Sequence, residues 1–396
     1  MQTLDGPGRH VLFLNWRDTR NPEGGGSEVY VERIAEELIA HGHRATLLCA
    51  SHPGAPGEET TESGLRILRR GGRHTVYLRA ALVYLAGLVG FGPLRTRSLG
   101  RPDLIVDVCN GLPFLSPLYA RCAVIILVHH VHREQWSVVL GAWGARIGWW
   151  IESSFATRVY RRCRYVTVSA ATRGELALLG VDPGRVTVVY NGTPELTPET
   201  APRTPHPSLL VLCRLVPHKR VEIALEAVAR LAPEFPGLRL VVAGQGWWET
   251  RLRDVADELG IGDRVHFAGF VSEPDKHELL CSTWVALTPS LKEGWGLTIV
   301  EAGAVGTPTV AFHDAGGVTE AIVAGETGLL ARDTADFVAQ VRSLLADDVF
   351  RHEMGKAAQS HAARFTWSAS GDRFADLVRT VTDGRPRPAA ERYLTP

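Results

Sequence analysis

The sequence lacks the features that mark nucleic-acid-binding, disulfide-rich and secreted proteins. Its 43 lysine and arginine residues are balanced by 43 aspartate and glutamate residues, so no overall positive charge favours binding to nucleic acid. The six cysteines include no C-x-x-C pair, which favours reduced thiols over disulfides or zinc ligands. The first apolar run, Val11 to Leu14, is too short for the hydrophobic region of a signal peptide. We therefore expect a cytoplasmic protein, and any nucleotide that it binds should be small.

The chain is long and apolar enough to build more than one hydrophobic core. It has 396 residues, of which 45% are hydrophobic, and this length favours two domains over one. Short apolar runs alternate with amphipathic segments in both halves, which is typical of parallel α/β sheets. Strands are expected at 11–14, 44–49, 104–108, 123–128, 165–168, 186–190, 209–212, 238–243, 265–267, 285–288 and 309–312, and helices at 28–41, 222–231 and 250–259. The predicted fold class is α/β with two doubly wound sheets.

A segment rich in proline and poor in large apolar residues separates the two series. It follows Asn191-Gly192 and cannot pack a core, so it reads as a linker. We expect an N-terminal domain at 1–191, a linker at 192–207 and a C-terminal domain at 208–365. A helix at about 366–382 is expected to join the N-terminal domain, and 383–396 to form a loose tail. Two such sheets in tandem would bind a ligand in a cleft between the C-terminal edges of their strands.

A single carboxylate interrupts the most apolar stretch of the second half. Glu301 is the only formal charge from Gly294 to Phe312, a stretch that predicts a buried helix. Burying an unpaired carboxylate costs on the order of several kcal/mol, so a polar group should meet it. Two glycines, Gly294 and Gly296, lie where this helix would begin and leave backbone N–H groups facing outward. Together with Glu293, these features predict one site for a ligand that carries both hydroxyls and phosphate.

Several motifs, taken in their order along the chain, resemble one family. They are Gly25-Gly26-Ser27-Glu28, Gly42-His43, His129, Asn191-Gly192, Arg214-Leu215-Val216-Pro217-His218-Lys219, Gly244-Gln245-Gly246, Phe267-Ala268-Gly269-Phe270, Glu293 with Glu301, and Gly316-Gly317 followed by Glu320. This series resembles the family-4 retaining glycosyltransferases over roughly Gly24 to Trp367. The two glutamates match the E-x7-E signature of the family, with Trp295 where the family usually has Phe.

The resemblance implies the GT-B fold, in which two Rossmann-like domains face each other across a deep cleft. It implies transfer of a hexosyl group from a UDP- or GDP-linked sugar to an acceptor hydroxyl, with the anomeric configuration kept and with no cofactor or metal. Lipid-linked glycans, polysaccharide ends and small natural products all stay open as acceptors. A nucleotide-sugar epimerase or phosphorylase of similar fold and a non-catalytic sugar-nucleotide-binding subunit are the alternatives.

The resemblance also assigns roles to individual residues. Arg214 and Lys219 would stabilise the charge that grows on the leaving diphosphate, although a solvated cationic turn would have the same sequence. Glu301 would accept hydrogen bonds from the ribose hydroxyls, and Glu293 would contact the transferred sugar, unless it is an ordinary loop acid beside Lys292. The remaining donor-binding residues are expected to be Gly25, Gly26, Asn191, Gly192, Gly246, Phe270, Val271, Gly294, Trp295, Gly296 and Leu297.

Three histidines follow the expected strand 123–128. The resemblance assigns His129 to the donor sugar and the reaction centre, although His130 could take that place in a register shifted by one residue. A metal site at His129, His130 and His132 is the alternative, but no carboxylate or second ligand cluster has a recognisable spacing. A purely structural role, with the ring hydrogen-bonded in the core, is the other interpretation of His130 and His132.

Two regions combine arginines with apolar or tryptophan-rich segments. Arg66, Arg69, Arg70 and Arg73 precede an apolar run from Val76 to Phe91, and the segment 143–164 is rich in Trp and Arg. The apolar run is too short to span a bilayer, but segments 66–91 and 143–164 could rest on a membrane surface, which would make the protein peripheral at the inner membrane face. A core helix is the other explanation of the run.

Overall fold

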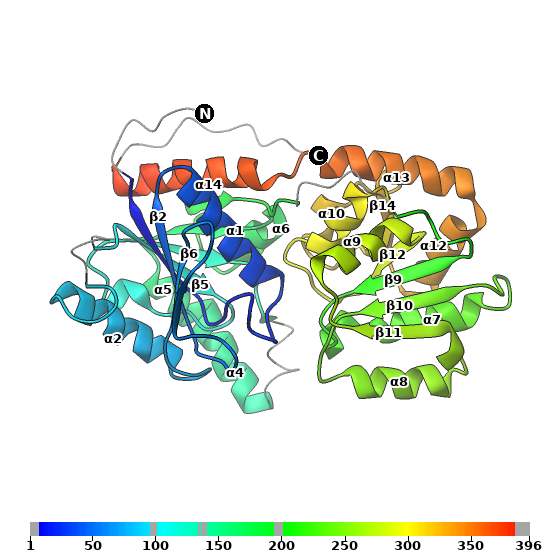
Figure 1. Cartoon of the computed structure of the whole chain (residues 1–396), viewed down its shortest axis with the longest axis horizontal. Coiled ribbons are helices and arrows are strands. Elements are labelled where there is room, and N and C mark those ends of the chain that lie inside the picture. Colours follow the sequence, from blue (N-terminus) through cyan, green and yellow to red (C-terminus); the bar gives the residue numbers. More distant parts are fainter. Residues whose placement is uncertain (1–7, 96–100, 134–135, 137–140, 194–200, 385–396) are drawn as a thin grey trace. The chain divides into compact units, whose positions relative to one another are not determined.

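A computed structural model describes every residue except 1–7, 96–100, 134–135, 137–140, 194–200 and 385–396 (Figure 1). The chain divides into two compact units, residues 1–191 with 367–395 and residues 192–366. Residues 194–200 of the expected linker 192–207, and all but two residues of the expected tail 383–396, lie outside the described residues. None of the helices in the described parts of the chain is both long and apolar enough to cross a bilayer.

The first unit is built around an eight-stranded sheet. The strand order is β3-β4-β2-β1-β5-β6-β7-β8, and every pair is parallel except β3 with β4. Its strands are β1 (His10–Leu14), β2 (Arg44–Cys49), β3 (Glu58–Thr60), β4 (Arg66–Arg69), β5 (Leu104–Cys109), β6 (Ala123–Val128), β7 (Arg164–Thr167) and β8 (Val186–Val188). Its helices are α1 (Gly26–Ala40), α2 (Val76–Leu88), α4 (Ala142–Trp150), the π-helical η2 (Ile151–Ala156), α5 (Thr157–Val159), α6 (Ala170–Leu178) and α14 (Trp367–Thr382), with the 3₁₀ turns η1 (Ser116–Leu118) and η3 (Pro183–Arg185).

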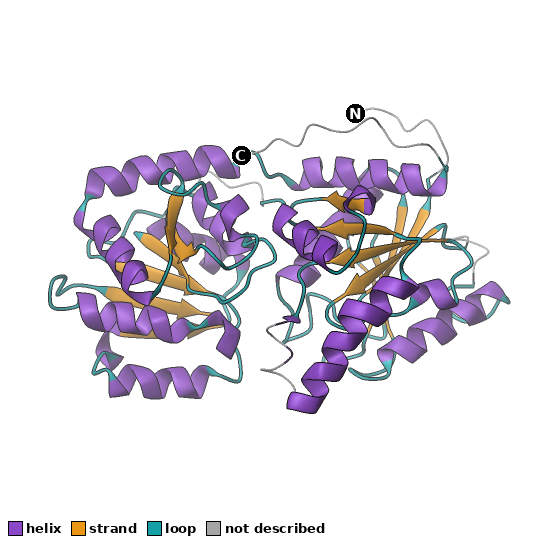
Figure 2. Ribbon diagram, turned by 180° about the vertical axis from the view of Figure 1, so that it is seen from behind, coloured by secondary structure: helices purple, strands orange, loops and turns teal. Residues whose placement is uncertain are grey.

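Helices cover both faces of this sheet, which is why its central strands read as unbroken apolar runs (Figure 2). On one face, the C-terminal helix α14 packs beside α1, and Phe374 lies with its ring centroid 6.3 Å from that of Phe13. On the other face, α2 packs over a core cluster that includes Leu12 and Ile105. The segment from α4 to α5 packs on this second face too. Its buried residues form a second core cluster, and Val124 of β6 packs against both this cluster and the cluster under α2.

The second unit has a six-stranded sheet in the order β11-β10-β9-β12-β13-β14, and all its pairs are parallel. Its strands are β9 (Ser208–Leu212), β10 (Arg239–Ala243), β11 (Val265–Gly269), β12 (Val285–Thr288), β13 (Thr309–Phe312) and β14 (Gly328–Ala331). Its helices are α7 (Val221–Leu231), α8 (Glu249–Glu258), α9 (Glu273–Ser282), α10 (Leu297–Ala304), α11 (Val318–Ala321), α12 (Thr334–Ala346) and α13 (Asp348–Ala362), with the 3₁₀ turns η4 (Pro217–Lys219) and η5 (Gly262–Arg264). The predicted α/β class with two parallel-dominated sheets is confirmed.

All eleven strands expected from the sequence are present, with ends that differ by at most two residues. The strands β3, β4 and β14 were missed. β3 is a three-residue edge strand with two glutamates, and β4 begins and ends with arginine, so neither shows an apolar pattern. Arg69 is nevertheless fully buried, because it forms ion pairs with Asp18 and Glu59.

Candidate active site

The expected catalytic cations lie where β9 leaves the C-terminal edge of the second sheet. Arg214 is exposed two residues after the strand, and Lys219 ends the 3₁₀ turn η4. The next residue, Arg220, takes a left-handed conformation with φ 48° and donates from Nε to the carbonyl of Pro289 at 2.9 Å. The backbone N–H of Leu291 donates to the carbonyl of His218 at 2.8 Å. The connections that follow β9 and β12 are thus hydrogen-bonded to each other.

Lys219 and Glu293 meet between these two connections. The Lys219 Nζ lies 2.5 Å from Oε1 of Glu293, and the two side chains are 15% and 17% exposed. Burial alone would raise the pKa of Glu293, but the charge and hydrogen bond of Lys219, with help from Ser290 and His218, hold it below its usual range. Glu293 is therefore ionised at neutral pH and is not an ordinary surface acid.

The segment that carries Glu293 is fixed by the connection after β13. The N–H of Glu293 donates to the carbonyl of Ala315 at 2.8 Å, and the carbonyl of Glu293 accepts from the N–H of Gly317 at 3.0 Å. These two bonds form an isolated bridge outside the sheet. They fix the backbone of the residue that carries the carboxylate.

The helix α10 begins at the expected glycines and has no side-chain cap. Gly296 is left-handed with φ 99°, and a Cβ atom there would lie 2.7 Å from Cδ1 of Ile299. Gly294 precedes the buried Trp295, whose ring lies 4.9 Å from that of Phe365, and Leu297 is the first residue of the helix. The first N–H groups of α10 are therefore not covered by a capping side chain, as an anion site at a helix start requires.

Glu301 has a partner that the sequence did not reveal. The expectation that a polar group meets Glu301 is confirmed, and the group is Nζ of Lys276 on α9, which lies 2.9 Å from Oε1 of Glu301. The same Nζ lies 2.7 Å from Oε2 of Glu273. Burial is the largest effect on Glu301 and raises its pKa, while Lys276 opposes this rise. The pair joins α9 to α10, and Glu301 is only 6% exposed.

The other expected donor-binding residues of this unit follow β10 and β11. The chain at Gly246 passes so close to the turn after β9 that a Cβ atom would lie 2.0 Å from the carbonyl oxygen of Leu215. The N–H of Gly244 donates to the carbonyl of Gly269 at 2.7 Å, which joins the ends of β10 and β11. Phe270, directly after β11, is 76% exposed, and Val271 is half-buried.

In the first unit, the expected residues lie after β1, β6 and β8. Gly25 caps α1, and its N–H donates to Oε2 of Glu28 at 2.8 Å, while Gly26 is exposed. Asn191 is buried at the end of this unit, and Gly192 opens the second unit. Residues 25 and 26 and residue 129 thus share the C-terminal edge of the first sheet with residue 191.

His129 is buried directly after β6. Its ring lies edge-on to that of Tyr30, with centroids 5.3 Å apart, and its Nε2 has no hydrogen-bond partner within the described residues. Burial, together with the nearby His132, lowers the pKa of His129 to about 3, so its ring is neutral at physiological pH. The described residues contain no group of three histidine, cysteine, aspartate or glutamate side chains placed to hold a metal ion.

Three features of these sites escaped the sequence analysis. They are three contacts between residues that are distant in the sequence: Lys276 with Glu301, Lys219 with Glu293, and Glu152 with His132. The scarcity of lysine could have indicated two of these contacts, because the chain has only four lysines, Lys219, Lys276, Lys292 and Lys356. Three of the four lie within or beside the glutamate segment or pair with its carboxylates.

Comparison with known proteins gives matches over most of the chain. A family model described as Glycosyltransferase Family 4 matches residues 24–195, and one described as Glycosyl transferases group 1 matches residues 193–361. A glycogen synthase of Mycobacterium tuberculosis is 32% identical over 413 residues, which span 96% of each chain. A D-inositol 3-phosphate glycosyltransferase of Stackebrandtia nassauensis is 38% identical over 194 residues, 46% of this chain and 43% of the relative.

Solved structures share the fold at low identity. Sucrose-phosphate synthase from Thermosynechococcus elongatus has a TM-score of 0.77 at 18% identity, and covers 95% of this chain and 100% of its own. The Anabaena protein HepE, solved in complex with UDP and glucose, has a TM-score of 0.71 at 17% identity, with 94% and 100% covered.

Proposed function

Because the chain belongs to the family-4 glycosyltransferases and is a nucleotide-sugar glycosyltransferase, we propose that it moves a hexosyl group from a UDP- or GDP-linked sugar to an acceptor hydroxyl with retention of configuration and without a metal ion. The observation that carries the proposal is the meeting of Lys219 and Glu293 beside the uncapped start of α10. A cation, a carboxylate and free backbone N–H groups there match a ligand with phosphate and sugar hydroxyls.

The charge chemistry falls to Arg214 and Lys219. As the glycosidic bond breaks, negative charge grows on the leaving diphosphate, and fixed cations that face it lower the barrier. Lys219 is held in place by Glu293, so it needs little reorganisation when the charge develops. With two protein cations in this role, the leaving group needs no metal ion, and addition of EDTA should leave the rate unchanged.

Retention requires either a covalent intermediate or a reaction on one face of the sugar. A covalent route needs a carboxylate nucleophile on the face opposite the leaving group. Glu293 is bonded to Lys219, and Glu301 to Lys276, so both carboxylates already have structural partners. We favour the same-face route, in which the leaving phosphate helps to accept the proton of the acceptor hydroxyl. Proton NMR of the product would decide the stereochemistry, because an inverted anomeric signal contradicts the proposal.

Glu301 would bind the ribose of the donor. Its Oε1 accepts from Lys276, and a carboxylate has further acceptor sites for ribose hydroxyls. We expect the wild-type protein to bind a nucleoside diphosphate more tightly than its 2′,3′-dideoxy analogue, and Glu301→Gln to reduce this preference. Equal reduction of affinity for both ligands would contradict ribose contact by Glu301.

Thermal unfolding against a panel of nucleoside diphosphates identifies the base, since a ligand at 100 times its Kd stabilises the folded protein by about 2.7 kcal/mol. Transfer assays with the matching donor sugar then test the enzyme. Turnover of the donor by the purified chain excludes a non-catalytic binding subunit, and conversion of the sugar without a glycosyl acceptor would indicate an epimerase instead.

We also propose that the first unit contacts the inner face of a membrane through α2 and α4. Along α2, the large apolar residues Leu78, Leu82 and Leu85 are 41 to 66% exposed, while Val76, Ala80 and Tyr84 face the core. On α4, Trp143, Ile147 and Trp150 recur at helical spacing and are 55 to 79% exposed. Both helices cover the same face of the sheet, so both apolar stripes belong to one layer.

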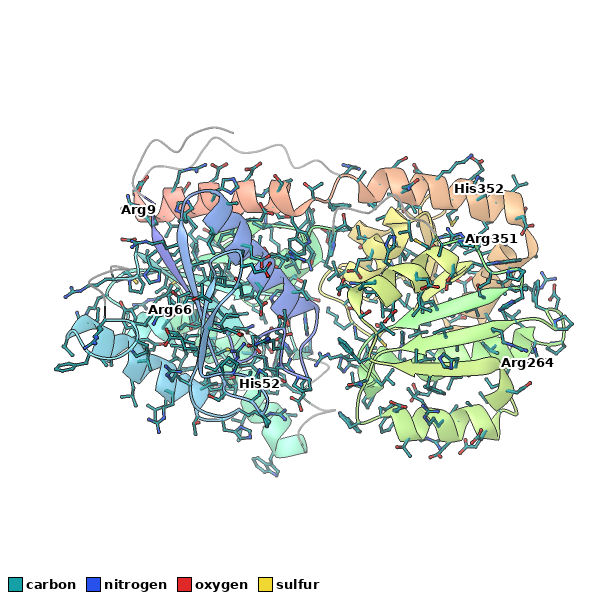
Figure 3. All side chains as sticks on the ribbon, in the orientation of Figure 1. Arg9, His52, Arg66, Arg264, Arg351 and His352 are labelled. Atoms are coloured by element: carbon teal, nitrogen blue, oxygen red, sulfur yellow. The ribbon has the colours of Figure 1, made fainter. Side chains whose placement is uncertain are left out.

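The arginines before α2 contribute less than expected. Arg66, which is labelled in Figure 3, is bound to Glu58 and to the carbonyl of Pro93. The buried Arg69 is paired with Asp18. Arg79 on α2 and Arg146 on α4 are exposed beside the apolar stripes, and Arg73 before α2 is exposed too. A surface with apolar side chains and arginines fits an anionic bilayer.

Vesicle flotation tests the membrane contact. Wild-type protein should float with anionic vesicles at low salt, and Leu78→Ser with Leu82→Ser should lose this binding. Val349→Ser is the matched control, because Val349 is 73% exposed and lies on α13 in the second unit. Absence of wild-type flotation, or equal loss with the control, contradicts membrane contact through this layer.

A further inference from the structure

Glu152 is a buried carboxylate for which the proposed reaction has no use. Its side chain is 6% exposed and lies on η2, a π-helical segment of six residues between α4 and α5. Segments of π-helix are rare, and those that exist are often found at functional sites. A carboxylate in this position is costly unless hydrogen-bond donors meet it. The hydrogen-bond donors to Glu152 therefore show which segment the carboxylate fixes.

The donors to Glu152 come from the segment that follows β6. The backbone N–H of His132 lies 3.0 and 3.2 Å from the two carboxylate oxygens. The Nδ1 of His132 lies 3.0 Å from Oε1, and Nε1 of Trp136 donates to Oε2 at 2.8 Å. One carboxylate thus binds the main chain and the side chain of His132 and one indole.

The ring of Trp136 is held by two glycines. A Cβ atom at Gly148 would lie 2.5 Å from the Trp136 ring, and one at Gly111 would lie 3.1 Å from it. The indole therefore lies directly against the backbone of α4 on one side and of the turn after β5 on the other. This close packing fixes Trp136 so that its N–H points at Glu152.

The same segment begins with His129. The carbonyl of His129 accepts from Oγ1 of Thr172, at a distance of 3.2 Å, next to the N-terminus of α6. Three residues later, Glu152 binds His132. The segment 129–132 is thus fixed at both ends, and His130 lies between, with its ring centroid 4.1 Å from that of His132.

We propose that Glu152 is a positioning residue, which holds the segment 129–132 so that His129 and His130 keep a fixed orientation at the edge of the first sheet. This inference rests on the proposed function, because the histidines are taken to face the reaction centre. Only an anionic carboxylate accepts from all three donors. A glutamine would turn an N–H group toward one of them and break that bond.

The test compares Glu152→Gln with two variants of its surroundings. Trp136→Phe removes one donor but keeps a ring between the glycines. Ser153→Ala is the control on the same π-helical segment, since its hydroxyl donates to the carbonyl of Trp149 at 2.6 Å and not to the histidine segment. We expect Glu152→Gln to lower kcat by about 10- to 100-fold, because small displacements of groups at a reaction centre have effects of this size. Trp136→Phe should have a smaller effect, the double variant should match Glu152→Gln, and Ser153→Ala should match the wild type.

Three measurements separate positioning from loss of folding. The Kd for the nucleoside diphosphate should stay within about twofold, because Glu301 and Lys219, which we propose contact its ribose and phosphates, lie in the second unit. Side-chain NMR of the histidines should show changed His129 and His132 signals in Glu152→Gln, while His313, exposed in the second unit, stays unchanged. Unchanged kcat in Glu152→Gln, an equal loss in Ser153→Ala, or unchanged histidine signals would overturn the inference. A wild-type protein without transfer activity refutes the proposed function instead, and the histidine signals then still test the positioning.

Discussion

Lys219 and Glu293 are separated by 74 residues in the sequence, and their charged atoms lie 2.5 Å apart. Each restrains the other: the lysine keeps the pKa of the glutamate low, and the glutamate holds the lysine at the end of η4. A cation that already has an anionic partner is well placed to share its charge with a second anion. We therefore propose that the pair acts together, with Lys219 contacting the diphosphate of the donor and Glu293 contacting its sugar.

Replacing Lys219 tests the catalytic half of this pair. Lys219→Ala should lower kcat by about 10²- to 10³-fold, as loss of one preorganised donor to a transition state usually does. Lys292→Ala is the control, because it removes a lysine next to Glu293 in sequence that is not assigned to the leaving group. Steady-state kinetics with saturating donor measure the effect. Near-normal turnover of Lys219→Ala with intact donor binding would rule out this role.

The pair of Lys276 and Glu301 predicts a strong coupling in stability. Lys276→Met leaves Glu301 buried without a cation and should reduce the free energy of unfolding by about 3–5 kcal/mol, as breaking a buried ion pair does. Glu301→Gln should cost less, since Lys276 keeps its contact with Glu273. The double variant should therefore be more stable than Lys276→Met alone. Urea denaturation of the four proteins gives the coupling, and additive effects would show that the two side chains do not interact.

The low pKa of His129 predicts how stability changes with pH. The folded state holds this ring neutral down to about pH 3, while in the unfolded chain it binds a proton below its ordinary pKa of 6.5. Between these values the unfolded state binds more protons, so His129 makes stability fall as the pH is lowered from 6.5 toward 3. His129→Gln should show a shallower fall in this range. Denaturation curves at several pH values measure it, and parallel pH profiles of the two proteins contradict a buried neutral His129.

The sequence was sufficient for elements whose signal is local. The run Ala123 to Val128 is apolar throughout because helices cover both faces of the sheet, and its strand was predicted with the correct ends. Gly294 and Gly296 likewise indicated the uncapped start of α10.

Pairings across the chain gave no such signal. Arg69 made β4 look like a surface segment, although Asp18, 51 residues away, neutralises it in the core. Lys276 reaches Glu301 only because α9 and α10 pack side by side. Whether such a charged residue can be buried depends on its ion-pair partner. Tertiary packing determines that partner, and no spacing in the sequence identifies it.

The scarcity of lysine allows the donor site to be observed directly. Reductive methylation with ¹³C-labelled formaldehyde keeps the charge of lysine and gives one NMR signal for each of the four side chains. Addition of the nucleoside diphosphate should shift the signals of Lys219 and Lys276, because in our proposal Lys219 contacts the phosphates and Glu301, the partner of Lys276, contacts the ribose. Lys356 is the internal control, since it lies exposed on α13 and pairs with Glu353. Single Lys→Arg variants assign the signals. A shift of Lys219 without Lys276 would retain the phosphate site but contradict the ribose contact, whereas shifts confined to Lys356 would contradict both.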